Sequence, residues 1–140
     1  MAAPNIDPIF SRIADIQWTV IPSATTANTA LDGTGTVFTI FTADATNGGF
    51  VQAIRIKAPS TSTATVIRFF LNNGSTNATA ANNSLIDEMT LPTTAASSVA
   101  ATPVYEIPIG RALPAGYKIN CCYATAVTGA VYLTAFGGKY

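Results

Sequence analysis

Two runs of alternating residues, at 64–71 and 83–91, most restrict the folds open to this chain. In the first run Ile67 and Phe69 lie two positions apart, and residues at that spacing share one face of an extended chain. The second run places a similar set on one face, namely Leu85, Asp87, Met89 and Leu91. Asparagine, glycine and serine separate the runs, as in a surface connection between strands. We therefore predict two paired strands at the centre of an all-β sandwich.

The same alternation, interrupted by glycine and proline, predicts further strands along the chain. The expected strands lie at 16–21, 36–42, 50–58, 64–71, 83–91, 104–109, 117–124 and 130–136. About eight strands in two antiparallel sheets indicate a jelly-roll sandwich, whereas the main alternative, an immunoglobulin-like sandwich, does not need the eighth. Pro103 and Pro108 suggest that the sixth strand is short or lies at a sheet edge. We expect one β-sandwich domain over 16–140, because half of a 140-residue chain would bury too little core.

Residues 1–15 lack this alternation and are expected to form an N-terminal arm or a short helix. Asp7-Pro8 could begin such a helix, with Ile9, Ile13 and Ile16 along one stripe. The apolar residues of this segment must be covered, either by the chain's own sandwich or by a neighbouring subunit. Trp18, on the first strand, is expected to anchor a core or an interface. The predicted assembly contacts are therefore Ile6, Ile9, Phe10, Ile13 and Trp18.

Low charge restricts the kinds of partner. Only 10% of residues are charged, against about 25% in ordinary soluble proteins, and seven basic residues balance seven acidic ones. Neither nucleic acid nor a membrane surface is expected as a partner, because both require a basic patch. A net charge near zero favours association with copies of the chain or with other subunits. No apolar run reaches the length of a membrane span, and residues 1–8 do not resemble a secretory signal, so we expect synthesis in a cytoplasm.

The sequence offers little for catalysis. It contains no histidine, which removes the Ser-His-Asp and Cys-His constellations and any histidine-ligated metal. Asp87 and Glu88 are adjacent on a strand and so face opposite ways, which does not suit an acid–base pair. Cys121 and Cys122 are expected to be free thiols for the same reason. We predict that the protein is not an enzyme and holds no cofactor or metal.

Three weaker patterns have simpler explanations. Gly33-Thr34-Gly35 suits a turn better than a phosphate-binding loop, because no third glycine and helix follow. Asp32 and Asp44 are too isolated for a calcium site. The aromatic residues could form a sugar-binding platform, although strand positions favour a core or subunit interface. These residues are Trp18, Tyr105, Tyr117, Tyr123 and Tyr132.

Five stretches together resemble small structural proteins of tailed bacteriophages. They are Asn5–Ile9, Ile16–Trp18, Thr26–Thr36, Phe69–Asn77 and Ala112–Ile119. The resemblance implies a virion component, in the first place a head decoration (cement) protein that binds and stabilises the shell. The expected partners are the major capsid protein and copies of the chain itself, as a homotrimer on the capsid surface, assembled in the host cytoplasm. The alternative is a tail-tip or fibre-associated module that binds host glycans.

Overall fold

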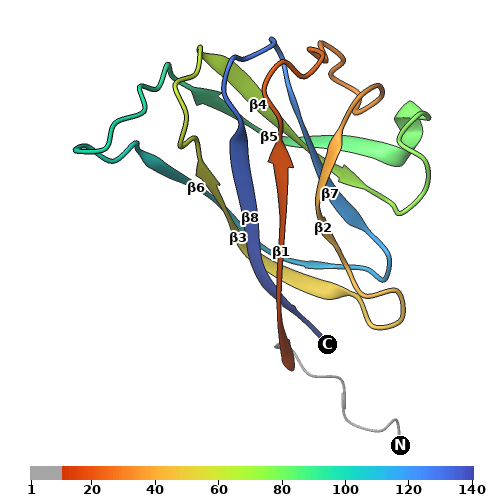
Figure 1. Ribbon diagram of the computed structural model, residues 1–140. Coiled ribbons are helices and arrows are strands. Elements are labelled where there is room, and N and C mark those ends of the chain that lie inside the picture. Colours follow the sequence, from red (N-terminus) through yellow and green to blue (C-terminus); the bar gives the residue numbers. More distant parts are fainter. Residues whose placement is uncertain (1–10) are drawn as a thin grey trace, which may run out of the picture.

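Eight strands form two four-stranded antiparallel sheets in the computed structural model, which describes residues 11–140 (Figure 1). Sheet A contains, in spatial order, β1 (Ile13–Ile21), β8 (Val131–Lys139), β3 (Gly49–Lys57) and β6 (Val104–Leu113). Sheet B contains β2 (Phe38–Thr42), β7 (Lys118–Tyr123), β4 (Thr65–Asn72) and β5 (Asn83–Leu91). A 3₁₀ turn, η1 (Ala80–Asn82), precedes β5.

The strand pairs are nested along the chain. β1 pairs with β8 and β3 with β6 in sheet A, while β2 pairs with β7 and β4 with β5 in sheet B. A ribbon of strand pairs folded over in this way gives the eight-stranded jelly roll. The prediction of an antiparallel β-sandwich is therefore confirmed, and the order of the strands is not that of an immunoglobulin-like sandwich.

The predicted central pair is present but displaced. β4 and β5 do pair, yet β5 is an edge strand of sheet B. A bulge also breaks the expected alternation in β5, because Phe69 pairs with Asp87 whereas the next residue, Phe70, pairs with Leu85. Leu85 therefore does not share the face of Asp87, contrary to the sequence prediction, and the extra residue Ile86 lies between them.

β1 begins at Ile13, earlier than the sequence predicted, so Ile13 and Ile16 belong to a strand and not to the stripe of a helix. The reason is tertiary, since Ile13 and the following residues pair with the end of β8. Ile6, Ile9 and Phe10 lie outside the described residues. β6 is an edge strand, as Pro103 and Pro108 suggested, but it continues to Leu113 through a register shift.

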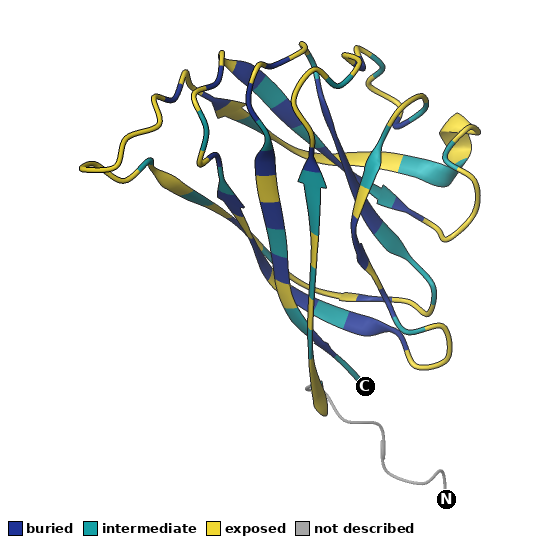
Figure 2. Ribbon diagram, viewed as in Figure 1, coloured by how far each residue is buried: buried dark blue, intermediate teal, exposed yellow. Residues whose placement is uncertain are grey.

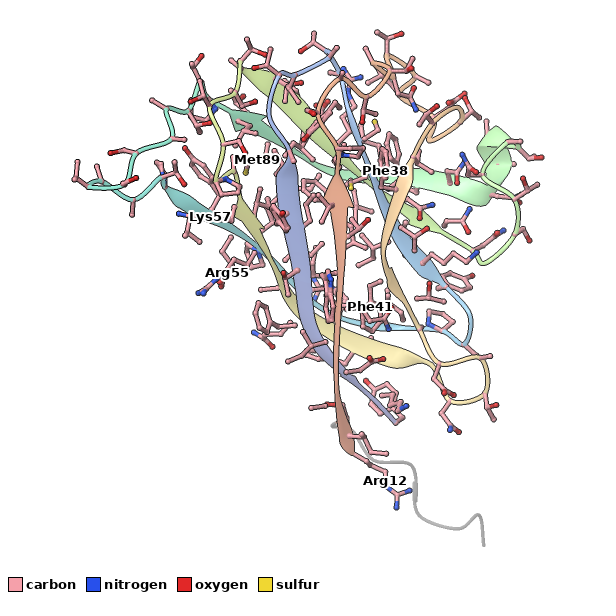
Figure 3. All side chains as sticks on the ribbon, in the orientation of Figure 1. Arg12, Phe38, Phe41, Arg55, Lys57 and Met89 are labelled. Carbon is pink, nitrogen blue, oxygen red and sulfur yellow. The ribbon has the colours of Figure 1, made fainter. Side chains whose placement is uncertain are left out.

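The main core fills the space between the two sheets. β3 shows the underlying pattern, because Ile54 and Ile56 are fully buried while Arg55 and Lys57 point outward (Figures 2 and 3). Core side chains from both sheets include Ile21, Phe41, Ile67, Phe69, Ile119 and Leu133. Burying each such side chain contributes about 1.5–3 kcal/mol, which makes this layer the principal source of stability.

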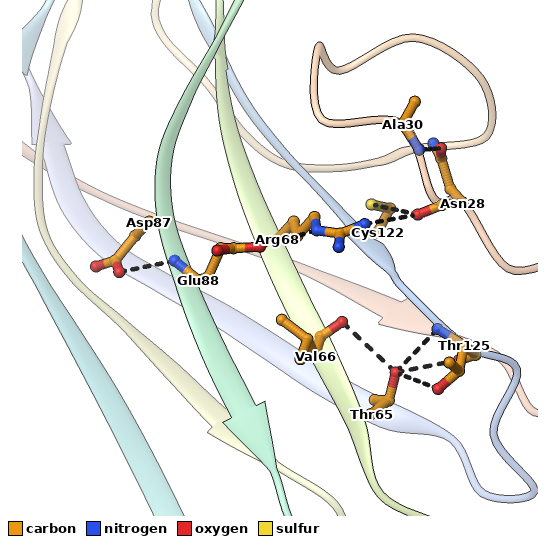
Figure 4. A network of polar contacts seen from close by, with 9 residues as sticks. All are labelled: Asn28, Ala30, Thr65, Val66, Arg68, Asp87, Glu88, Cys122 and Thr125. Atoms are coloured by element: carbon orange, nitrogen blue, oxygen red, sulfur yellow. Dashed lines mark hydrogen bonds and ion pairs between the residues drawn. The ribbon is translucent and has the colours of Figure 1, made fainter.

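The connection between β1 and β2 packs on the outer face of sheet B and is fixed there by Asn28 (Figure 4). The Asn28 carbonyl accepts hydrogen bonds from the Arg68 guanidinium at 3.2 Å and from the Cys122 thiol at 3.8 Å. Its side-chain amide donates to the carbonyls of Thr34 and Thr36 at 2.7 and 2.9 Å. The buried polar groups under the connection are thus paired, as burial requires.

Candidate assembly surface

The outer face of sheet A carries a regular grid of side chains. The strand register places three rows of directly paired residues across β1, β8, β3 and β6. The rows are Val20, Tyr132, Lys57 and Val104; Trp18, Thr134, Arg55 and Glu106; and Ile16, Phe136, Ala53 and Pro108. Apolar residues therefore gather on β1 and β8, and charged residues on β3 and β6.

We call Ile16, Trp18, Val20, Tyr132 and Phe136 the apolar strip. Trp18 is 69% exposed, Ile16 50%, Tyr132 47% and Phe136 37%. β8 has apolar residues on both faces, since Val131, Leu133 and Ala135 fill the core between them. Contiguous exposed apolar surface of this kind marks interaction sites in soluble proteins. The strip is the best candidate for a contact surface in the described part of the chain.

An exposed ion pair lies beside the apolar strip. Arg55 and Glu106 face each other across β3 and β6 with Nη2 and Oε2 3.6 Å apart, and both side chains are more than half exposed. The Arg55 guanidinium also lies 5.9 Å from the centre of the Phe136 ring, within range of a cation–π contact. An exposed pair of this kind contributes at most about 1 kcal/mol. The border of the strip also carries the positive charge of Lys57, in the row beside this pair.

The structure separates the predicted assembly residues. Trp18 lies on the apolar strip, so of the two roles expected for it the core role is wrong. Ile13 is also exposed, but strand alternation places it on the face opposite Trp18, at the row that contains Lys139. Ile6, Ile9 and Phe10 fall among residues 1–10, which the structure does not describe. From the sequence, Tyr132 was named only among the five candidate aromatic residues and Phe136 was not selected, although apolar residues on both faces of 131–136 were the available signal.

The five aromatic residues considered as a sugar-binding platform do not share one surface. Tyr123 is buried in the core and its hydroxyl donates to the Ile21 carbonyl at 3.3 Å. Tyr105 and Tyr117 pack against the core from its margin. Trp18 and Tyr132 remain on one exposed face, at diagonal positions of neighbouring strands. A platform of five aromatic residues is therefore wrong, and a two-residue surface replaces it.

Both cysteines are free and buried on opposite faces of β7. Burial raises the pKa of the Cys121 thiol well above its ordinary value. Burial also raises the pKa of Cys122, although the nearby Arg68 guanidinium opposes this effect. Neither thiol is poised as a nucleophile, because nucleophilicity requires an accessible thiolate.

The loop carboxylates of Asp32 and Asp44 accept hydrogen bonds within their own turns. The hydroxyl and the backbone amide of Thr34 donate to Asp32 and lower its pKa. The backbone amides of Asn47 and Thr46 do the same for Asp44. Within residues 11–140 no cluster of three or more cysteine, aspartate or glutamate residues is placed to hold a metal ion. Over the same range there is no helix of sufficient length and apolarity to cross a membrane.

No protein-family model and no curated protein sequence matches the chain. Among solved structures, it is similar to a mutant VP2 protein of infectious bursal disease virus in derived T=1 particles, at 14% identity and a TM-score of 0.31. That match covers 100% of this chain and 37% of the VP2 chain. A structure of the Gt strain of the same virus gives 11% identity, a TM-score of 0.30, and coverage of 96% and 37%. The chain thus spans little more than a third of these virus proteins. Likeness at this level carries no argument about function.

Proposed function

We propose that this protein is a structural component of a bacteriophage particle, namely a decoration protein that binds the head shell and stabilises it. The observation that carries the proposal is the apolar strip, an exposed sheet face with Trp18 near its middle. Large aromatic side chains in such positions are the residues most often responsible for binding energy at protein interfaces. The sequence resemblance to phage structural proteins gives the partner, which is the major capsid protein.

Repetition would make a modest contact effective. A shell presents many identical sites, and an oligomer of this protein would engage several of them at once, so that each later contact is intramolecular. A neutral chain also avoids repulsion between copies held close together on one surface. We place the protein on the outer capsid surface as a homotrimer, assembled in the host cytoplasm.

The test is to locate the protein and then to disrupt the strip. In image reconstructions of particles from the source phage, density for the jelly roll is expected on the outer head surface. Purified Trp18→Ala protein should bind such heads at least tenfold more weakly than the wild type. Val99→Ala is the control, since Val99 is 97% exposed on the loop between β5 and β6, away from the strip. Density elsewhere on the particle, or equal binding by wild-type and Trp18→Ala protein, would contradict the proposal.

A second candidate function has one observation in its favour. Trp18 and Tyr132 are both exposed and lie at diagonal positions, where two aromatic rings could stack on neighbouring sugars. This would suit a tail-tip or fibre-associated module that binds host glycans. Binding of the purified protein to a glycan array, lost in Trp18→Ala and accompanied by no affinity for heads, would favour it over decoration.

A further inference from the structure

The two long edges of the sandwich differ. At one edge the Gln17 side chain bonds to the backbone of Thr42 and joins β1 to β2. At the other edge, where β5 and β6 lie, a cavity of about 260 Å³ opens between the sheets. Its apolar lining is Leu71, Ile86, Pro108, Ile109, Leu113 and Ile119. We call this cavity the β5/β6 pocket.

The lining of the β5/β6 pocket changes from apolar to charged towards its mouth. Ile119 and Leu113 are buried, with exposed fractions of 0% and 6%, and Ile109 is half-buried. The charged residues of the lining, Asp87 and Arg111, are both exposed. Ligand pockets commonly combine an apolar interior with a few polar groups that fix the orientation of the ligand. An occupant of this pocket therefore needs an apolar body and a polar group at the entrance.

Of the two charged side chains, Arg111 is the one better placed to hold a ligand. Asp87 Oδ1 accepts a hydrogen bond from the Glu88 backbone amide at 2.8 Å, so this carboxylate already has a partner on its own strand. Neither of the two ion pairs within residues 11–140 includes Arg111. A guanidinium binds carboxylates through two parallel N–H···O bonds, which are stronger than bonds between neutral groups. The polar group of the occupant is therefore expected to be a carboxylate.

The strands beside the pocket are poorly suited to pairing with an added strand. Pro108 has no amide hydrogen to donate, and the bulge at Ile86 interrupts the regular pairing of β5. The Glu88 amide is bonded to the Asp87 side chain. Prolines, bulges and charged residues at sheet edges all oppose pairing with another chain. These features favour a small molecule, which needs no backbone pairing, over an extended peptide.

The volume of the pocket sets the size of the ligand. An apolar cavity of about 150 Å³ in another protein binds benzene. At the same packing, the 260 Å³ of the β5/β6 pocket would hold roughly ten non-hydrogen atoms. A straight-chain carboxylic acid with about eight carbons has this number of atoms. An inorganic anion would leave most of the apolar lining uncovered.

We propose that the β5/β6 pocket binds a medium-chain alkyl carboxylate, with the chain against Ile109, Leu113 and Ile119 and the carboxylate on the Arg111 guanidinium. The site is separate from the apolar strip, which lies on the outer face of sheet A, and does not depend on the proposed decoration role. Ile109 and Leu113 belong to sheet A and Ile119 to sheet B, so the ligand would contact both sheets. Because it binds the folded state alone, it would also stabilise the fold.

Isothermal titration calorimetry of the full chain with octanoate at pH 7 tests the proposal. Octanoate should bind one per chain with a Kd below about 1 mM, and about tenfold more tightly than octan-1-ol or octylammonium. Arg111→Gln should weaken octanoate binding about tenfold, to the level of octan-1-ol. Asp87→Asn is the matched control at the same mouth and should bind octanoate at least as tightly as the wild type. Absence of octanoate binding, equal affinity for the three head groups, or full affinity in Arg111→Gln would overturn the proposal.

A second measurement locates the ligand. Trp18 is the single tryptophan of the chain and lies on the apolar strip, so its fluorescence reports binding there. Octanoate in the β5/β6 pocket should leave this fluorescence unchanged and should shift the backbone amide NMR signals of Leu71, Leu113 and Ile119. A saturable change in Trp18 fluorescence without shifts at these three residues would place the alkyl chain on the strip and overturn the assignment to the pocket.

Discussion

The side-chain amide of Gln17 pairs with the backbone of Thr42 as a second peptide group would. Gln17 Nε2 donates to the Thr42 carbonyl at 2.9 Å, and the Thr42 amide donates to Gln17 Oε1 at 2.9 Å. The same Nε2 also donates to an Asp15 carboxylate oxygen at 3.0 Å. One side chain on an edge strand of sheet A therefore satisfies the backbone at the edge of sheet B.

Two replacements of Gln17 should show how much these hydrogen bonds contribute to stability. Gln17→Ala removes three hydrogen bonds at a partly exposed edge, two with Thr42 and one with Asp15, and should lower the free energy of unfolding by about 1–2 kcal/mol. Gln17→Glu should lower it further at pH 7, because a carboxylate then faces both the Thr42 carbonyl and Asp15. This extra loss should disappear below about pH 4, as the introduced carboxylate is protonated. Urea unfolding at both pH values measures the difference, and an equal deficit for the two variants at pH 7 would argue against the bonding described.

The two ion pairs of the described chain should differ in strength. Arg68 is 16% exposed, lies 2.9 Å from Glu88 and also donates to the Asn28 carbonyl, so Arg68→Met should reduce stability by about 1–3 kcal/mol. Arg55→Met removes the exposed pair with Glu106 and should cost less than about 1 kcal/mol. Chemical denaturation compares them. A larger loss of stability in Arg55→Met than in Arg68→Met would show that the Arg68 hydrogen bond to Asn28 does not stabilise the fold.

Two glycines with nearly the same backbone angle provide a matched comparison. Gly33 has φ of +75° and a Cβ there would lie 2.6 Å from the Asn83 Cβ, whereas Gly116 has φ of +74° and open space around it. Gly116→Ala should cost about 1 kcal/mol from backbone strain alone. Gly33→Ala should cost at least 1 kcal/mol more, because the turn must move away from η1 and β5. Thermal unfolding of both variants tests this, and similar losses would mean that the close approach is easily relieved.

Trp18 should matter for association and little for folding. Trp18→Ala removes an exposed side chain and should change the free energy of unfolding by less than about 1 kcal/mol. By contrast, Ile54 is fully buried, so Ile54→Ala should lower the free energy of unfolding by about 2–5 kcal/mol. Circular dichroism with urea gives both values. A large loss for Trp18→Ala would instead make the strip part of the folding core.

Stability should fall in alkaline solution. Burial raises the pKa of Cys121, Cys122 and Tyr123 above the ordinary values of 9.0 for a thiol and 10.0 for a phenol. The folded state then binds more protons than the unfolded state above about pH 9, so the free energy of unfolding decreases as pH rises from there. The sequence has no histidine, so little change is expected between about pH 6 and 8. Urea midpoints from pH 6 to 10.5 test this, and a Cys122→Ala variant should show a shallower alkaline decline.

The sequence was sufficient for the strands whose alternation is simple. In β3 the predicted alternation is observed: Ile54 and Ile56 face the core, and Arg55 and Lys57 face outward. Prediction failed where pairing partners intervened. Ile13 was expected in an N-terminal arm or a short helix but continues β1, because the end of β8 is available to it. In β5 a bulge at Ile86, invisible in the local pattern, changed which residues face inward.

The candidate surface was predicted only in part. Trp18 was selected as an anchor, but its exposure depends on β1 being at an edge and on the lack of a further layer over sheet A in the described chain. Tyr132 and Phe136 join it through strand register, which no short stretch of sequence specifies. The cavity between β5 and β6 was not foreseen, because these consecutive strands are edge strands of different sheets.

The thiols of Cys121 and Cys122 point to opposite sides of β7, one into the core and one beneath the connection fixed by Asn28. Each sulfur is therefore buried on its own face of sheet B, away from the other sulfur and from solvent. Both thiols are therefore expected to stay free in oxidising as well as in reducing solution for as long as the protein remains folded.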